Sequence, residues 1–182
     1  MRTKLGKALK QAAIGGAIAA TATVGFAATD GAVGFNSTGN LIITMDVNDD
    51  VRISGLSDLL FGTLAGTGAT LTSPACIYRN SGAPNSNYEV TAVGSGVGGA
   101  FTLLGATGAT VPYTVTFNDT TGGASTPMGI GTIAPGTNAR GDVDCATLGN
   151  NASIDVTISD AAAAAAPSDA YTGTLTLTVS PV

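Results

Sequence analysis

Tyr171-Thr-Gly-Thr-Leu-Thr-Leu-Thr-Val-Ser-Pro-Val182, at the end of the 182-residue sequence, alternates apolar residues with threonine and serine. Successive side chains of a β-strand point to opposite faces of the sheet, so this period of two indicates a strand with one buried face. The predicted inner face carries Tyr171, Leu175, Leu177 and Val179. We expect a sandwich that finishes on this strand to have an open sheet edge beside its core.

A similar alternation recurs along the chain, whereas the 3.6-residue period of an amphipathic helix does not. Predicted strands lie at residues 51–53, 88–92, 101–103, 111–117 and 154–158, with turn residues between them. This spacing indicates an all-β antiparallel sandwich or barrel. Six alanines, Ala161 to Ala166, would favour a helix, but Pro167 follows them, so a single turn or a loop of small residues is predicted instead.

A spare strand-like run, Asn40-Leu-Ile-Ile-Thr-Met-Asp-Val47, lies near the other end of the sequence. Its alternate residues, which would share one face of a strand, are Leu41, Ile43, Met45 and Val47. Strand addition satisfies main-chain groups while alternate side chains fill pockets, so a neighbouring copy could lend this run to an open edge. Donor and acceptor would lie on different parts of each copy, and such head-to-tail contacts build an open filament.

The first 27 residues are predicted to be a secretory signal peptide. They begin with basic residues, continue with an apolar stretch rich in alanine and glycine, and reach small residues at Gly25-Phe-Ala27. Residues 28–50 then form an N-terminal extension, and residues 51–182 form one β-domain. Export through the periplasm to the cell surface is the expected route, without direct insertion into the membrane.

The charge of the chain changes sharply once the leader is removed. Three arginines then face twelve acidic residues, which gives a formal net charge of −9, and no lysine remains. A polyanion of this kind is a poor ligand for nucleic acid or anionic lipid. Two cysteines remain, Cys76 and Cys145, and in an exported protein such a pair predicts a disulfide.

The usual combinations of catalytic residues are missing from the sequence, so the chain is expected not to be an enzyme and to need no cofactor. It contains no histidine for a catalytic triad, and most of its aspartates stand at turns, where they cap backbone groups. Asp46-Val-Asn-Asp-Asp50 resembles a calcium loop only in its first residues, because the central glycine and the final glutamate are missing. No metal site is predicted.

Five stretches together resemble the spore coat protein U domain family, which includes the pilins of archaic chaperone–usher pili. They are Cys76-Ile-Tyr-Arg-Asn80, Tyr88-Glu-Val-Thr-Ala-Val-Gly-Ser-Gly96, Gly99-Ala-Phe-Thr-Leu103, Pro112-Tyr-Thr-Val-Thr-Phe-Asn-Asp119 and Tyr171 to Pro181. The resemblance spans nearly the whole chain after the leader. The chain departs from the family's major pilin in having no cysteine near its first predicted strand.

The resemblance implies an incomplete immunoglobulin-like sandwich that lacks its last strand and is completed by donor-strand exchange. A periplasmic chaperone would first supply the missing strand, and the extension of the next subunit would replace it at an outer-membrane usher. The donor strand would present Leu41, Ile43, Met45 and Val47. The acceptor groove would be walled by Val51 and Ile53 on one side and by Tyr171, Leu175, Leu177 and Val179 on the other.

The implied function is that of a structural pilus or fimbrial subunit, a pilin that serves adhesion or biofilm formation as a homopolymer or beside neighbouring pilins. A spore-coat structural protein of the same fold is an alternative. A secreted carbohydrate-binding module is a weaker one, because sugar sites usually carry exposed aromatic platforms and the chain has no tryptophan.

Overall fold

The computed structural model describes residues 28–80, 87–120 and 125–182. The chain divides into two units, Met1–Asp46 and Val47–Val182. The second unit contains all the strands: β1 Val51–Ser54, β2 Ala69–Arg79, β3 Tyr88–Gly94, β4 Thr102–Gly105, β5 Thr110–Pro112, β6 Thr114–Asn118, β7 Thr126–Met128, β8 Ala134–Gly136, β9 Ala152–Ile158, β10 Tyr171–Thr172 and β11 Leu175–Pro181. The helical elements among the described residues are a short 3₁₀ turn, η1 Val97–Gly99, and one α-helix, α1 Asp160–Ala165.

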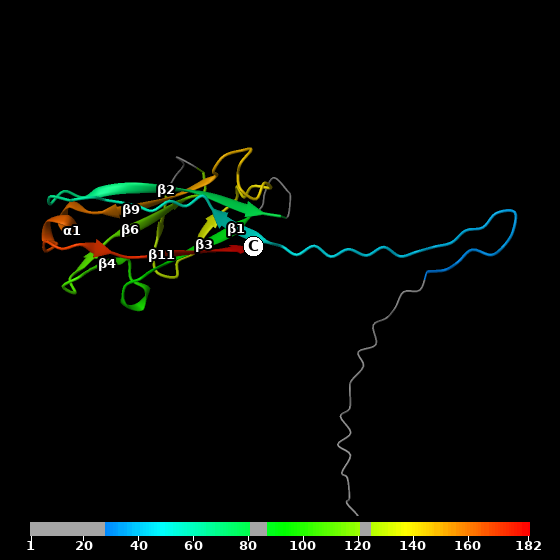
Figure 1. Ribbon diagram of the computed structural model, residues 1–182, viewed down its shortest axis with the longest axis horizontal. Coiled ribbons are helices and arrows are strands. Elements are labelled where there is room, and N and C mark those ends of the chain that lie inside the picture. The colour runs from blue at the N-terminus through cyan, green and yellow to red at the C-terminus, as the bar shows by residue number, and fades with distance from the viewer. Residues whose placement is uncertain (1–27, 81–86, 121–124) are drawn as a thin grey trace, which may run out of the picture. The chain divides into compact units, whose positions relative to one another are not determined.

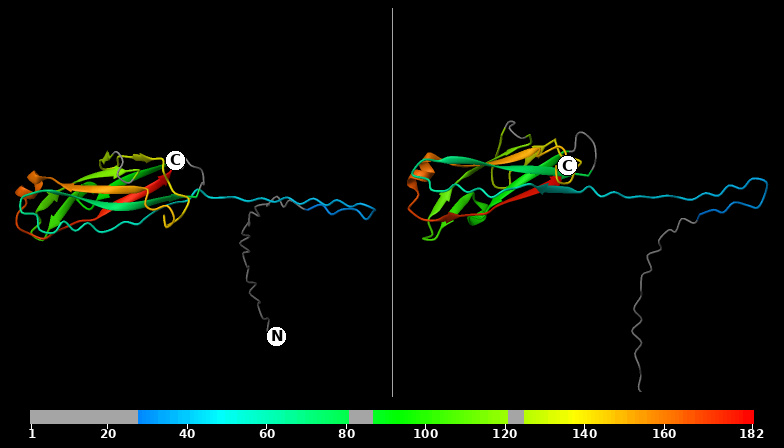
Figure 2. Two further views of the ribbon diagram at one scale, coloured as in Figure 1. Left: turned by 90° about the horizontal axis from the view of Figure 1, so that it is seen from above. Right: turned by 45° about the horizontal axis from the view of Figure 1, so that its top comes forward.

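The strands of the second unit form an antiparallel β-sandwich. One sheet has the order β1-β2-β9-β6-β7, and two three-stranded sheets, β10-β4-β5 and β11-β3-β8, lie opposite (Figures 1 and 2). Every ladder between named strands is antiparallel. The prediction of an all-β, immunoglobulin-like sandwich is confirmed.

The core lies between the two layers and is built from the alternate residues of each strand that face inward. Tyr88 and Phe117 are almost completely buried and pack edge to face, with ring centroids 6.3 Å apart. The Tyr88 hydroxyl donates a hydrogen bond to Asp119, and burial together with this carboxylate raises the pKa of the phenol. Aromatic packing and a satisfied hydroxyl therefore tie β3 to the end of β6.

The longest strand, β2, has no counterpart among the predicted strands. Its middle carries Ser73, Pro74 and Ala75, which give no hydrophobic alternation. Proline is compatible with this position because β1 pairs only with residues 76–79, which leaves one side of Pro74 without a partner strand in the described chain. The other side of Pro74 faces Ser153 of β9.

Two predicted strands are each divided in the structure. The run 111–117 forms β5 and β6, because the chain passes from one layer to the other at Tyr113, whose N–H donates to the Phe101 carbonyl at 2.9 Å. The final run is divided into β10 and β11 at Gly173 and Thr174. There, the Thr174 N–H donates to the Ser95 Oγ at 3.0 Å, a side-chain bond in place of a ladder bond.

The alanine-rich stretch is a helix of six residues, so the prediction of a single turn or a loop is wrong. Ser159 caps it, since its side chain accepts a hydrogen bond from the Ala162 N–H at 3.2 Å. Ala163 is buried and belongs to the core. Capping and packing against the sandwich supply the stability that such a short helix lacks alone.

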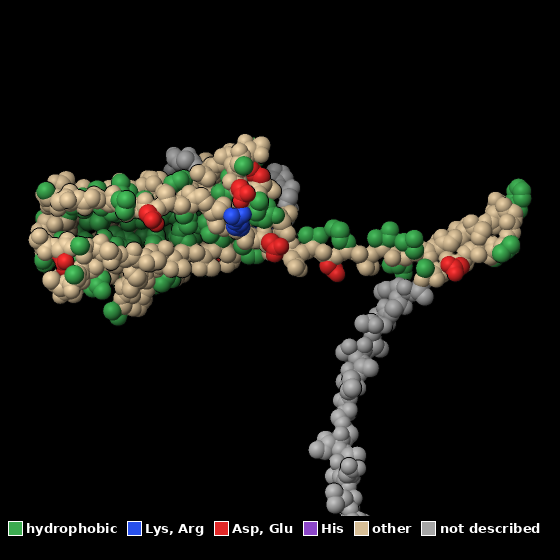
Figure 3. All heavy atoms as spheres, in the orientation of Figure 1, with side chains coloured by type: hydrophobic (Ala, Val, Ile, Leu, Met, Phe, Trp, Pro, Cys, Tyr) green, Lys and Arg blue, Asp and Glu red, His purple; other side chains and the backbone are tan. Residues whose placement is uncertain are grey.

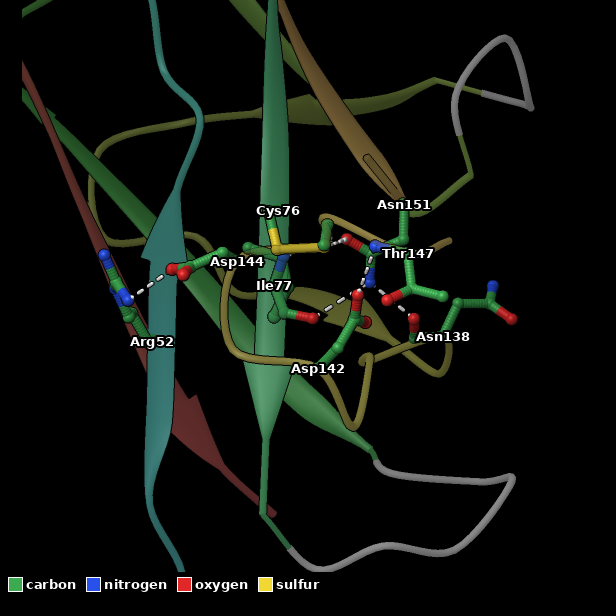
Figure 4. The surroundings of a disulfide bond; sticks show 9 residues. Arg52, Cys76, Ile77, Asn138, Asp142, Asp144, Thr147 and Asn151 are labelled. Carbon is green, nitrogen blue, oxygen red and sulfur yellow. Dashed lines mark hydrogen bonds and ion pairs between the residues drawn. A yellow bond between two sulfur atoms is a disulfide. The ribbon is translucent and has the colours of Figure 1, made fainter. Parts of the chain in front are cut away.

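The disulfide prediction is confirmed, because Cys76 and Cys145 are bonded, with their Cα atoms 5.8 Å apart. The bond attaches the loop before β9 to β2 (Figure 4). Beside it, the buried amide of Asn151 accepts from the Ile77 N–H at 2.8 Å and donates to the Ile77 carbonyl at 3.0 Å. The β9 ladder ends at Ala75, so on this side Ile77 is bonded by the Asn151 side chain and by the Arg140 N–H, which donates to the Ile77 carbonyl at 2.8 Å.

The first unit is described from residue 28 onward, and the predicted signal peptide, residues 1–27, lies outside the described residues. Thr29 and Asn40 exchange two main-chain hydrogen bonds of 2.9 Å, so the chain between them is closed into a loop. Residues 41–50 form no strand in the described structure. The strand-like run 40–47 therefore pairs with nothing beyond that single bridge.

Substituting Gly136 by alanine tests the tight packing of β8 on the Tyr88 ring. A Cβ atom there would lie 2.1 Å from the Tyr88 Cζ atom, so the buried ring or the strand would have to move. We expect Gly136→Ala to lower the free energy of unfolding by about 1–3 kcal/mol in urea titrations. The matched control is Gly141→Ala, where a Cβ meets no atom within 4 Å. Equal stability of the two variants would contradict this packing.

Candidate functional site: an open apolar groove

A groove of about 1210 Å³ runs along one edge of the sandwich, bounded by residues 56–66 on one side and residues 166–177 on the other. We call it the edge groove. Figure 3 shows hydrophobic side chains gathered in a hollow between the two layers of the domain.

One wall of the edge groove is formed by β10, β11 and the loop before them. β11 pairs with β3 along its whole length and is the first strand of its sheet, so its other edge has no partner strand among the described residues. Leu175 and Leu177 face the groove and are half-buried. This wall therefore offers both apolar side chains and unpaired main-chain groups.

The opposite wall is the connection from β1 to β2. Residues 56–66 belong to no strand, and Leu59, Phe61 and Leu64 pack partly against the core. The Ser57 N–H donates to the Ser73 Oγ at 2.9 Å, which holds the segment against β2. β1 itself is the edge strand of the larger sheet, and it approaches β11 near one end of the groove.

The floor of the edge groove belongs to the hydrophobic core. Val156 and Ile158 come from β9, while Val111 and Tyr113 come from β5 and the residue after it. These side chains are buried, although they line the groove. An occupant of the groove would therefore contact the core of the sandwich directly.

The structure places three of the predicted acceptor residues, Tyr171, Leu175 and Leu177, in the lining of the edge groove. The other three are half-buried but are not part of that lining: Val51 and Ile53 lie on β1, and Val179 lies on β11. Their role in accepting a strand stays a prediction. Sequence reasoning missed the wall at residues 56–66, whose signal was five large apolar residues within nine positions: Leu56, Leu59, Leu60, Phe61 and Leu64.

The predicted donor residues are exposed in the chain. Leu41, Ile43, Met45 and Val47 have exposed fractions of 68%, 84%, 82% and 66%. Side chains of this kind gain about 1.5–3 kcal/mol each when they are fully buried. Burying these four side chains against another surface would therefore be strongly favourable.

The end of the groove near Tyr171 is held by Asp169. Its carboxylate accepts hydrogen bonds from the Thr107 N–H at 2.9 Å, the Thr107 hydroxyl at 2.7 Å and the Ala170 N–H at 2.8 Å. These donors hold the pKa of Asp169 below its usual range. The interaction joins the loop before β10 to the β4–β5 hairpin, so it fixes the shape of this end of the groove.

Other kinds of site find no support in the part of the chain that the structure describes. Those residues contain no group of three or more histidine, cysteine or acidic side chains that could bind a metal ion. They also include no helix with the length and apolar character needed to span a bilayer.

Comparison with known proteins gives limited matches. No family model and no curated protein matches the chain, so the resemblance to the spore coat protein U domain family stays a prediction. One similar solved chain comes from work described as "Chaperone-tip adhesin complex is vital for synergistic activation of CFA/I fimbriae biogenesis". It has 19% sequence identity and a TM-score of 0.49, over 74% of this chain and 42% of that chain. This chain thus spans less than half the length of that one.

The lowered pKa of Asp169 predicts a pH dependence of stability. A carboxylate with a depressed pKa stabilises the fold above its unfolded-state pKa, and the contribution is lost as pH falls through the folded value. We therefore expect Asp169→Asn to lower the urea midpoint at about pH 6, with the difference from the unsubstituted protein shrinking towards about pH 2.

Asp30→Asn in the N-terminal extension removes the same charge and serves as the control, with little expected change at either pH. A deficit of Asp169→Asn that stayed constant over the whole pH range would show that the ionised carboxylate does not stabilise this loop.

Proposed function

We propose that the protein is a structural subunit of a cell-surface pilus, polymerised head to tail by strand exchange. The observation that carries this proposal is the edge groove, an open apolar trough beside the free edge of β11. Monomeric proteins usually cover or interrupt such edges, because they invite pairing with another chain.

The proposed occupant is the 41–47 run of a neighbouring copy. Its alternate side chains are apolar and exposed, and its backbone pairs with no strand, so it can add to the free edge of β11. The intervening side chains, Ile42, Thr44 and Asp46, would then face outward. The acidic Asp46 would thereby remain in water.

The same groove explains why a chaperone would be needed before assembly. Val156 and Ile158 belong to the core and also form the floor of the open groove. Until a strand fills the groove, no strand of the described chain covers the core on this side. A periplasmic chaperone would supply that strand, and an outer-membrane usher would be the place of exchange, as the family resemblance implies. The polymer would serve adhesion or biofilm formation.

Removing the extension tests the donor assignment. Deleting residues 28–47 leaves the second unit almost intact, since that unit begins at Val47. We expect the deleted form to retain chaperone binding but to form no filaments in electron micrographs. Normal filaments from this variant would mean that another segment is the donor.

Two substitutions on opposite faces of the donor run test which face enters the groove. We expect Ile43→Asp in a peptide of residues 36–47 to lower its affinity for the deleted subunit by about 100-fold, because a carboxylate would enter an apolar trough. Thr44→Asp, one residue away on the opposite parity, introduces the same charge and should change affinity less than about threefold. Binding can be followed by fluorescence anisotropy, and equal losses for both peptides would reject strand-like insertion in this register.

A further inference from the structure

The last residue of β2, Arg79, uses its guanidinium to hold the chain just before β1. Its Nε donates to the Asp49 Oδ1 at 2.8 Å, and its Nη2 donates to the Asp49 Oδ2 at 2.5 Å. Arg79 is only 7% exposed, so this two-point ion pair is largely shielded on the arginine side. The carboxylate raises the pKa of Arg79, and the guanidinium lowers the pKa of Asp49.

The remaining donors of Arg79 bind two other parts of the second unit. Nη2 also donates to the Val182 backbone oxygen at 2.9 Å, and Nη1 donates to the Asn87 carbonyl just before β3. One buried side chain thus joins the chain before β1 to β2, to the residue after β11 and to the start of β3. These contacts connect both layers of the sandwich.

The neighbouring Asn80 reinforces the same point. Its Oδ1 accepts from the Asp50 N–H at 2.9 Å, its own N–H donates to the Asp50 carbonyl at 3.1 Å, and its side-chain amide donates to the Asn48 carbonyl. Residues 48–50 are therefore fastened by both main-chain and side-chain bonds. We call them the root of the extension.

A root held in this way matters because β1 is short. It forms four residue pairs with β2, from Val51↔Arg79 to Ser54↔Cys76. A pull on the extension would reach β1 at Val51 and could break these pairs one after another. The Arg79 contacts lie ahead of the first pair, so the pull reaches them before the ladder.

We propose that Arg79 and Asp49 anchor the extension, so that tension along the chain passes into β2 at Arg79 instead of peeling β1 from the sheet. Arg79 lies three residues after Cys76 on β2, and the disulfide of Cys76 attaches β2 to the loop before β9. The load at Arg79 is therefore applied close to a covalent link. This proposal rests on the proposed function, because only an extension held by a neighbour would be under tension. The anchoring itself can be measured on a single chain.

The test pulls the full chain in an optical trap, with handles attached before residue 41 and after Val182. We expect the unsubstituted domain to unfold without an earlier event. Asp49→Asn and Arg79→Lys should add a low-force step that releases residues 47–54, about 3 nm of extended chain. The step should appear in both variants because either change removes the two-point contact.

The matched control is an ion pair that β1 itself makes, Arg52 with Asp144 at 2.7 Å (Figure 4). Its side chains are 51% and 61% exposed, and such surface pairs contribute little. We expect Asp144→Asn to show no early step. An equal early step in this control, or none in the Asp49 and Arg79 variants, would overturn the proposal.

Hydrogen exchange on the full chain keeps the test decisive if Arg79→Lys folds poorly. In Asp49→Asn, we expect amides of β1 to exchange about tenfold faster or more, while those of β9 change by less than about twofold. A uniform increase across both strands would mean that Asp49 only supports overall stability, and this would also overturn the proposal.

Failure of the proposed function can be distinguished from failure of the anchor. We expect Asp49→Asn to form filaments as the unsubstituted protein does, since the substitution lies outside the edge groove and the donor run. If the unsubstituted protein formed no filaments while the early step still appeared in the variants, the anchor would stand as a property of the domain and the pilus assignment would fall.

Discussion

Unpaired main-chain groups at two sheet edges are the constraint on which the architecture depends. β1 and β11 each use one edge in a ladder, and a trough that reaches the core runs between the free edge of β11 and the segment 56–66 that follows β1. Each unmet N–H and C=O group in an apolar setting carries a desolvation cost, so such a trough favours an extended segment over loose contacts. Under the proposed function, an extended segment would satisfy both the apolar floor of the trough and the free edge of β11.

The two ends of this domain are stabilised by different interactions. Around Cys76 and Arg79 the contacts are covalent and polar: the disulfide, the Asn151 amide on Ile77 and the two-point bond to Asp49. Towards α1, the groove is lined by leucines and small residues, and the bonds from Thr107 to Asp169 hold the loop before β10.

Period-two alternation was sufficient to predict β3, β9 and β11, because in each strand the residues of one parity are more buried than those of the other. It could not reveal β2, where Ser73 and Pro74 interrupt the pattern, or the three-residue strands β7 and β8. The helix α1 depends on the Ser159 cap, which is a local signal, and on the burial of Ala163, which only the folded chain shows. The wall at residues 56–66 has no strand pattern, so only the folded chain shows that it borders the trough.

The burial of the disulfide has a consequence for how the chain matures. Cys76 is fully buried and Cys145 is only 4% exposed, so neither sulfur is open to a large oxidase once the sandwich has closed. Oxidation must accordingly come while the loop before β9 is still away from β2. A thiol–disulfide catalyst therefore has to act on a partly folded chain, and reductants reach the finished bond only when the domain opens.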